Sequence, residues 1–399
     1  MSLDVESLRS QFPSLSSGIA HFDGPGGTQT PRVVGQAIAD TLTGPLSNRG
    51  ASVASERNAD RTVREFRAAL ADFLNADPLG IVYGRSATQL TYDFARVLAA
   101  EWGPGDEVVV TRLDHDSNIR PWVQAAERRG AGVRWVGFDP DTAELSMDDL
   151  RAALGNRTRL VAVTAASNLL GTMPDIPTIA HLVHDAGALL YVDGVHYAAH
   201  ASVDLPALGA DFFVCSPYKF LGPHCGVLAA APALLETLHP DKLLPSTDMV
   251  PERFEFGTLP YEMMAGTTAA VDFLASLMGT VGSRRERLVS ANAGIERHEE
   301  HLLTLLEDAL AALPGVTVHS RARARTTTLL LTFAGRDAAE ASKFLAERDV
   351  LAPSSNFYAL EASRVLGLGS EGGLRIGLAP YTSEDDVRRL IDGLTAYLG

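Results

Sequence analysis

A single lysine, Lys219, follows an apolar run and a hydroxyl-bearing turn. Residues 211–226 read DFFVCSPYKFLGPHCG; Lys219 is the first lysine in the sequence, and the next is Lys242. An amine that burial removes from water loses its proton more readily and becomes a nucleophile. The stretch therefore suits a lysine that forms a Schiff base. The alternative is a lysine exposed in a surface turn.

A carboxylate ends the preceding apolar run. Leu189–Asp193 has the pattern of a buried strand with Asp193 at its carboxyl end. In open α/β sheets ligands lie beyond the carboxyl ends of the strands, so Asp193 and Lys219 are expected at one edge. An aspartate there can keep a pyridinium nitrogen protonated while a lysine holds the aldehyde carbon. This pair is what pyridoxal 5'-phosphate (PLP) requires as an electron sink.

An anion site is predicted at a third strand end. Residues 81–83 form a short apolar run, residues 84–89 a turn of small and polar side chains, and residues 90–100 a helical pattern. Free N–H groups and the helix dipole at such a start favour a phosphate. Any N-capped helix has these groups, so this turn alone does not establish a site.

Arg375 stands alone in an apolar run at 374–381. A buried charge needs a partner, and a guanidinium binds a carboxylate through two parallel hydrogen bonds. Arg375 is therefore expected to bind either the carboxylate of a ligand or that of an internal ion pair.

Apolar strands and helical patterns alternate from residue 81 to residue 219, which predicts a largely parallel sheet in an α/β protein. After it, a long helix is expected at 284–313. Shorter strands are expected at 317–319, 327–333 and 350–352, with an edge strand beginning at residue 374.

Two motifs give the chain a family resemblance. VDGVHYAAH at 192–200, followed by CSPYKFLGPHCGVL at 215–228, resembles the class V aminotransferase and cysteine desulfurase group of fold-type I PLP-dependent enzymes. The similarity runs from about residue 21 to about residue 394 and is greatest to the desulfurase-like branch. It implies a large PLP-binding domain at 20–285 with a mainly parallel seven-stranded sheet. A smaller α+β domain would consist of residues 1–19 and 286–399.

The resemblance also assigns roles to residues. Lys219, Asp193 and His115 would be catalytic, with His115 stacked on the pyridine ring. The resemblance further implies cofactor contacts from Ala87, Thr88, Asn168, His196, Ser216, Tyr218 and Thr258. Thr258 would reach the phosphate of a partner subunit, so the active unit would be a homodimer with shared sites. The substrate would be bound by Arg375, Asn168, Gly26 and Gly27, and no metal site is expected.

One departure from the family concerns sulfur chemistry. In desulfurases a mobile loop before the arginine strand carries the cysteine that takes the sulfur, whereas residues 352–360 read APSSNFYAL here. A serine cannot hold a persulfide. Cys225, close to Lys219 in the sequence, is considered as a substitute thiol.

The resemblance implies a carbanion formed from an external aldimine with a small amino acid. Without the loop thiol, the favoured outcome is cleavage of a C–S bond by β-elimination of cysteine or a cysteine S-conjugate. Sulfur transfer of the desulfurase type and transamination remain alternatives. A non-catalytic PLP-binding protein is a further one.

Composition restricts the partners. The chain has 399 residues, 46% of them apolar, which is enough for one large and one smaller domain. A formal net charge of −15 argues against nucleic acid or an anionic membrane surface as a partner. The sequence start lacks the features of a signal peptide, and no apolar run could span a bilayer. With two cysteines and no disulfide framework, a cytoplasmic location is expected.

Overall fold

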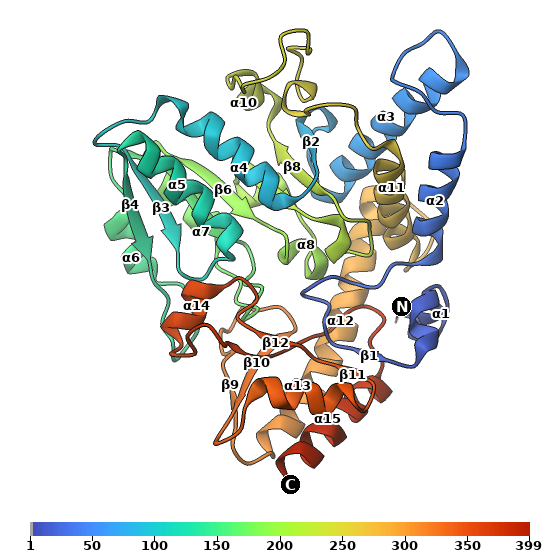
Figure 1. The fold of residues 1–399 in the computed structure, drawn as a ribbon, viewed down its shortest axis with the longest axis vertical. Coiled ribbons are helices and arrows are strands. Elements are labelled where there is room, and N and C mark those ends of the chain that lie inside the picture. The colour runs from blue at the N-terminus through green and yellow to red at the C-terminus, as the bar shows by residue number, and fades with distance from the viewer. Residues whose placement is uncertain (1–2) are drawn as a thin grey trace.

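A computed structural model describes residues 3–399 (Figure 1). Its largest sheet has seven strands in the order β2-β8-β7-β6-β5-β3-β4. Only β8 runs antiparallel to its neighbours, which confirms the mainly parallel sheet. The strands are β2 (Ile81–Gly84), β3 (Glu107–Thr111), β4 (Gly132–Val136), β5 (Thr158–Thr164), β6 (Leu189–Asp193), β7 (Phe212–Cys215) and β8 (Gly226–Ala230).

Both faces of this sheet are covered, which explains its nearly continuous apolar strands. Val109 belongs to one buried cluster, while its neighbours Val108 and Val110 belong to the cluster on the other face. The helices of this part are α2 (Arg32–Thr43), α3 (Ala54–Leu74), α4 (Ala87–Leu98), α5 (Arg120–Arg129), α6 (Met147–Ala153), α7 (Ile176–Asp185), α8 (Tyr197–His200), α9 (Leu205–Leu208), α10 (Pro232–Glu236) and α11 (Tyr261–Ser276). Side chains of α4 and α5 cover one face, and those of α3, α7 and α11 cover the other.

A four-stranded antiparallel sheet forms the lower part of the molecule in Figure 1, in the order β12-β13-β10-β9. Its strands are β9 (Val316–Val318), β10 (Thr328–Phe333), β12 (Ser354–Ser355) and β13 (Gly373–Gly377). The prediction that the arginine-bearing strand lies at an edge was therefore wrong. Two serines of β12 pair with Leu374 and Gly373, and so short a polar strand leaves no apolar pattern in the sequence.

The remaining elements lie around and between the two parts. β11 (Val350–Leu351) pairs in parallel with β1 (Ala20–His21) instead of joining the four-stranded sheet. The other helices are α1 (Val5–Ser10), α12 (Arg284–Ala311), α13 (Ala338–Ala346), α14 (Leu360–Val365) and α15 (Glu384–Leu398). The long helix α12 runs between the upper and lower parts (Figure 1). The domain boundaries at residues 19/20 and 285/286 stay predictions. None of the described helices has the length and apolar character to cross a membrane.

Candidate active site

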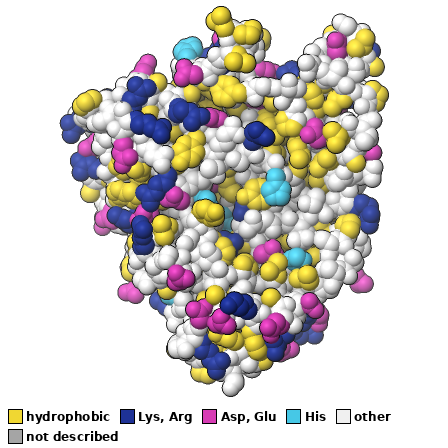
Figure 2. All heavy atoms as spheres, in the orientation of Figure 1, with side chains coloured by type: hydrophobic (Ala, Val, Ile, Leu, Met, Phe, Trp, Pro, Cys, Tyr) yellow, Lys and Arg dark blue, Asp and Glu magenta, His cyan; other side chains and the backbone are white. Residues whose placement is uncertain are grey.

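A cavity of about 700 Å³ opens at the carboxyl ends of β5, β6 and β7, where the strand-end residues were expected. It brings together most of the predicted site residues: Gly26, Ala87, Thr88, His115, Asn168, Asp193, His196, Ser216, Tyr218, Lys219 and Arg375. Acidic and basic side chains are interspersed on the face of the molecule drawn in Figure 2. The chemistry of the cavity depends instead on a few buried side chains that line it.

Lys219 is one of these buried groups, with 8% of its surface exposed, so it is not a surface lysine. β7 and the one-turn helix Pro217–Lys219 carry it into the cavity, where Nζ donates a hydrogen bond to the carbonyl of Pro25. Burial, assisted by the positive charge of Arg375, lowers the pKa of Lys219 to about 7, although Asp193 opposes this change. A large fraction of the amine is therefore neutral and nucleophilic at neutral pH.

Attachment of an aldehyde to Lys219 should consequently depend on pH with a midpoint of about 7. The rate should rise as the pH passes this value, because only the neutral amine attacks, and it should level off above it. Rapid mixing of PLP-free protein with PLP at different pH values, followed by absorbance, measures this profile. Arg375→Met should move the midpoint to higher pH, because it removes a neighbouring positive charge. A midpoint close to that of a free lysine would contradict the environment described.

Asp193 is the last residue of β6 and is 5% exposed. The N–H of Val195 donates to its Oδ1 atom at 2.9 Å. Burial raises the pKa of Asp193 to about 6, against the opposing effects of the Val195 hydrogen bond and Lys219. A buried carboxylate is stabilised by a facing cation, which is what a protonated pyridine nitrogen would provide.

His115 lies just after β3 and stacks against Tyr358, with ring centroids 5.5 Å apart. Its Nδ1 atom accepts the backbone N–H of Ser117 at 3.0 Å, so the proton of the neutral ring belongs on Nε2. Burial, with Lys219 and Arg375 nearby, lowers the pKa of His115 to about 4. The ring is therefore neutral around pH 7 and suited to stacking on an aromatic ligand.

The turn that is predicted to bind a phosphate lies at the start of α4. Ser86 caps α4 by accepting the N–H of Gln89 at 3.1 Å, and the helix begins at Ala87. Gly226 on β8 lies directly beneath this turn. A Cβ atom at Gly226 would stand 2.3 Å from the carbonyl carbon of Ser86 and 2.6 Å from the nitrogen of Ala87. The turn keeps its position because residue 226 has no side chain.

Gly226→Ala should therefore displace the turn. We expect the free energy of unfolding to fall by about 1–3 kcal/mol, the usual cost of overpacking, and the affinity for PLP to fall about tenfold. Urea unfolding and equilibrium titration with PLP measure the two effects. Gly35→Ala is the matched control, because no atom lies within 4 Å of its Cβ position in α2. That control should be neutral or stabilising. Equal behaviour of the two variants would show that the turn does not depend on the missing side chain at Gly226.

Arg375 lies in β13, 2% exposed, with its guanidinium carbon 3.6 Å from the centroid of the Phe357 ring. Nη1 donates to the carbonyl of Asn168 at 3.0 Å, and Nε is buried without a hydrogen-bond partner. Within residues 3–399 no carboxylate forms an ion pair with Arg375. Burial lowers the pKa of Arg375 to about 9. The internal ion pair considered from the sequence is therefore not formed, and a carboxylate from outside the chain fits this position.

One wall of the cavity comes from the segment at 352–360, which lacks a cysteine. Phe357 and Tyr358 line it with positive φ values of 50° and 60°. Asn168 Nδ2 donates to the Phe357 carbonyl at 2.9 Å, and Asp116 N–H donates to the Tyr358 carbonyl at 2.7 Å. Behind this wall, Glu361 accepts hydrogen bonds from Arg112 and Arg120. The segment without a cysteine is thus held at the cavity by several contacts.

Other predicted residues lie outside this cavity. Gly27 packs against Tyr218, whose Cδ2 atom is 3.2 Å from the Cβ position of Gly27. Thr258 lines a different hollow of about 580 Å³, next to Arg85 and His224. Cys225 is buried and hydrogen-bonded to Thr267, and it does not line the Lys219 cavity. Burial raises the pKa of the Cys225 thiol to about 12, which disfavours a reactive thiolate.

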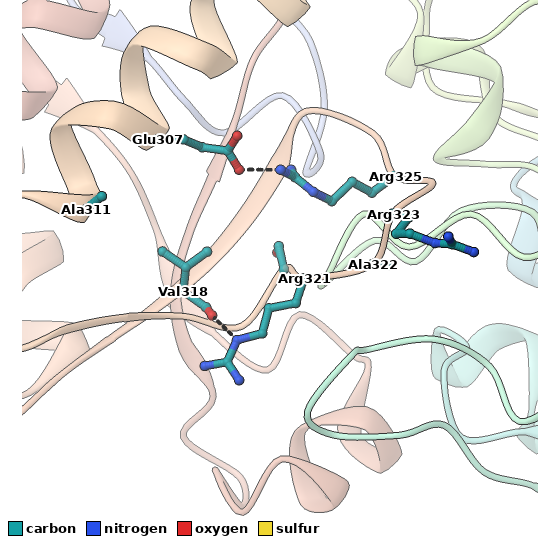
Figure 3. Close-up of a pocket in the computed structure, with 8 residues that line it drawn as sticks. Glu307, Ala311, Val318, Arg321, Ala322, Arg323 and Arg325 are labelled. Atoms are coloured by element: carbon teal, nitrogen blue, oxygen red, sulfur yellow. Dashed lines mark hydrogen bonds and ion pairs between the residues drawn. The ribbon is translucent and has the colours of Figure 1, made fainter.

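A further hollow of about 540 Å³ lies beside β9 and α12 (Figure 3). Three arginines line it, but their side chains diverge: Arg325 pairs with Glu307, Arg321 donates to the Val318 carbonyl, and Arg323 points away from both. The hollow contains no lysine. It therefore offers no convergent site comparable to the Lys219 cavity.

The fold is that of the fold-type I PLP-dependent enzymes, and comparison with known proteins gives the family. The family model Aminotransferase class-V matches residues 20–390. The chain belongs to this family, whose members are PLP-dependent enzymes.

Several relatives match over nearly their whole length. An uncharacterized protein of Mycobacterium tuberculosis is 32% identical, covering 99% of this chain and 100% of the relative. A probable cysteine desulfurase of Pseudomonas aeruginosa is 30% identical, covering 96% and 95%. The crystal structure of the cysteine desulfurase CsdA from Escherichia coli superposes with a TM-score of 0.88 at 26% identity, covering 100% of this chain and 99% of that chain.

Proposed function

We propose that this protein carries PLP on Lys219 and cleaves the C–S bond of cysteine or a cysteine S-conjugate by β-elimination. The observation that carries the cofactor assignment is the convergence of three buried groups in one cavity. These are an amine with a lowered pKa, a carboxylate at a strand end, and a guanidinium without a carboxylate partner. PLP supplies the electron sink for the reaction when it is bound.

The residues present fit this cofactor. Asp193 would face the ring nitrogen, His115 would stack on the ring, and His196 and Asn168 would lie near the ring oxygen. The phosphate would lie at the start of α4, with Ala87, Thr88, Ser216 and Tyr218 as contacts. Thr258 of the partner subunit would complete that contact, which makes the proposed active unit a homodimer. A cytoplasmic location belongs to the same proposal.

For the substrate, we assign the α-carboxylate to Arg375, with Asn168 and Gly26 beside it. Gly27 would contribute to substrate binding because it has no side chain, which lets the backbone lie close to the Tyr218 ring. The neutral Nζ of Lys219 would take the proton from the α-carbon of the substrate. The thiolate then leaves the β-carbon and is protonated. A cysteine S-conjugate plus water gives the thiol, pyruvate and ammonia.

The wall formed by Phe357 and Tyr358 supports elimination over sulfur transfer. No thiol lines the cavity within residues 3–399, and both cysteines of the chain are buried elsewhere. The cavity therefore has no cysteine that could take the sulfur atom from the substrate, as sulfur transfer requires. Sulfur transfer is the second candidate because related proteins are named as cysteine desulfurases. Transamination on the same site and PLP binding without turnover are the remaining alternatives.

Product analysis with L-cysteine, L-cystine and an S-conjugate tests the proposal. Pyruvate formed in equal amount with released thiol is the expected result. Alanine together with sulfane sulfur would overturn it in favour of sulfur transfer, and Cys225→Ser would then be the next variant to examine. Conversion of the bound cofactor to its amine form by an amino donor would indicate an aminotransferase. Cofactor binding with no turnover of any amino acid would indicate a binding protein.

A further inference from the structure

A second group of buried polar residues lies behind the cavity, where β10 meets the large sheet. His196 lines the cavity and is 2% exposed, and its Nε2 atom lies 3.1 Å from Thr326 Oγ1 and 2.9 Å from Thr328 Oγ1. Both threonines are buried. Nδ1, the other ring nitrogen, is buried without a hydrogen-bond partner in the described chain.

The proton count of this group indicates a tautomer. Nothing else in the described part of the chain accepts a hydrogen bond from either threonine hydroxyl. If Nε2 carried the proton, both hydroxyl protons would be buried without an acceptor. If Nε2 is bare, it accepts one of them, and Nδ1–H becomes the second buried donor without an acceptor in the described chain. An acceptor atom in the cavity would satisfy Nδ1–H, whereas in the other tautomer it would leave both hydroxyl protons unsatisfied. Since an unsatisfied buried donor costs about 1–3 kcal/mol, an acceptor in the cavity places the proton of the neutral ring on Nδ1.

The surroundings also keep this ring neutral. Burial, together with His200, Lys219 and Arg375, lowers the pKa of His196 well below its usual value. The His200 ring packs edge-on against His196, with centroids 4.7 Å apart. Glu299 of α12 fixes His200 by accepting from its Nδ1 atom at 2.9 Å, and it also accepts from Thr327 at 3.0 Å. The orientation of the His196 ring is therefore determined from two sides.

We propose that Thr326 and Thr328 are positioning residues that make His196 a hydrogen-bond donor, through Nδ1, to an anionic oxygen atom in the cavity. This inference rests on the proposed function, in which that atom is the ring oxygen of PLP. The two threonines stand at the start of the strand that pairs with β13, with Thr328 opposite Gly377 and Leu330 opposite Arg375. One small sheet thus orients both the proposed carboxylate contact and the donor to the ring oxygen.

The test compares variants of the complete PLP-loaded protein. The double variant Thr326→Val/Thr328→Val removes both hydroxyls and keeps the side-chain shape. Thr328→Ser restores one hydroxyl when combined with Thr326→Val. Thr332→Val is the matched control, because Thr332 lies on the same strand and its hydroxyl bonds the Nε2 atom of His319 at 2.9 Å, outside the cavity.

The first readout is the pH midpoint of the visible absorbance of bound PLP. A donor to the ring oxygen favours the form that has lost its proton, because that form has more negative charge on the oxygen. The double valine variant should therefore show a midpoint higher by about one pH unit, a tenfold change in proton binding. The serine variant and Thr332→Val should both keep the wild-type midpoint. An unchanged midpoint in the double variant, or an equal change in the control, would overturn the proposal.

A second readout does not depend on the visible absorbance. In PLP-loaded full-chain protein with ¹⁵N-labelled histidine, the His196 signals, identified by their loss in His196→Gln, report which nitrogen carries the proton. Protonated Nδ1 is expected in the wild type, and protonated Nε2 would overturn the inference. If borohydride reduction attaches no PLP mass to the protein, the proposed function itself fails. If PLP is attached and the midpoint does not move, this inference alone fails.

Discussion

Lys219→Ala is expected to abolish covalent attachment of PLP and to lower turnover by about 10⁴-fold or more. The variant loses both the amine that binds the aldehyde and the base that takes the α-proton. No other lysine can take its place, because the described residues that line the cavity include no second lysine. Intact-mass measurement after borohydride reduction detects attachment, and pyruvate release measures turnover.

Lys242→Ala is the control for this prediction, since Lys242 pairs with Asp248 and lies outside the cavity. It should retain both attachment and turnover. A reduced PLP adduct in Lys219→Ala protein would show that another amine carries the cofactor. Stability gives an independent check. Relative to Lys219→Ala, the PLP-free wild type should become more stable from about pH 7 to about pH 10.5, because the unfolded chain keeps a proton that the buried amine has lost.

The parts of the site that the sequence predicts belong to the large parallel sheet. Its strands are buried on both faces, so they appear as apolar runs, and polar residues directly after them fall at one edge. Asp193 and Lys219 were found by this rule, His115 came from the family resemblance, and the cavity contains all three. The rule needs only local pattern and strand direction, both of which are present in a single stretch of chain.

The parts that the sequence does not predict depend on pairing between distant segments. Thr326 and Thr328 meet His196 from 130 and 132 residues away, and no local pattern marks a threonine as the partner of a histidine. Phe357 covers the guanidinium of Arg375 because a backbone turn with positive φ places it there. The strand of Arg375 appeared to be an edge strand because its neighbour β12 has only two polar residues.

Arg375→Met is expected to lower kcat/KM for amino acids by about 10²–10⁴-fold, mainly through KM. Two charge-assisted hydrogen bonds to the substrate carboxylate would be lost, each worth about 1.5–3 kcal/mol. An amine substrate without the carboxylate should react equally with the variant and the wild type, because neither can use the missing contact. Steady-state kinetics with a cysteine conjugate and its decarboxylated analogue provide the comparison.

Arg325→Met is the matched control for this variant. Arg325 already pairs with Glu307 and lines the hollow beside α12, so its replacement should leave carboxylate recognition unchanged. Breaking a buried ion pair typically costs about 3–5 kcal/mol. The Arg325–Glu307 pair is only partly buried, and Arg375 has no carboxylate partner in the described chain, so both variants should cost clearly less. A stability loss of that full size, or an equal kinetic loss with the analogue, would mean that Arg375 maintains the structure. A loss confined to substrates with a carboxylate would identify Arg375 as the group that recognises it.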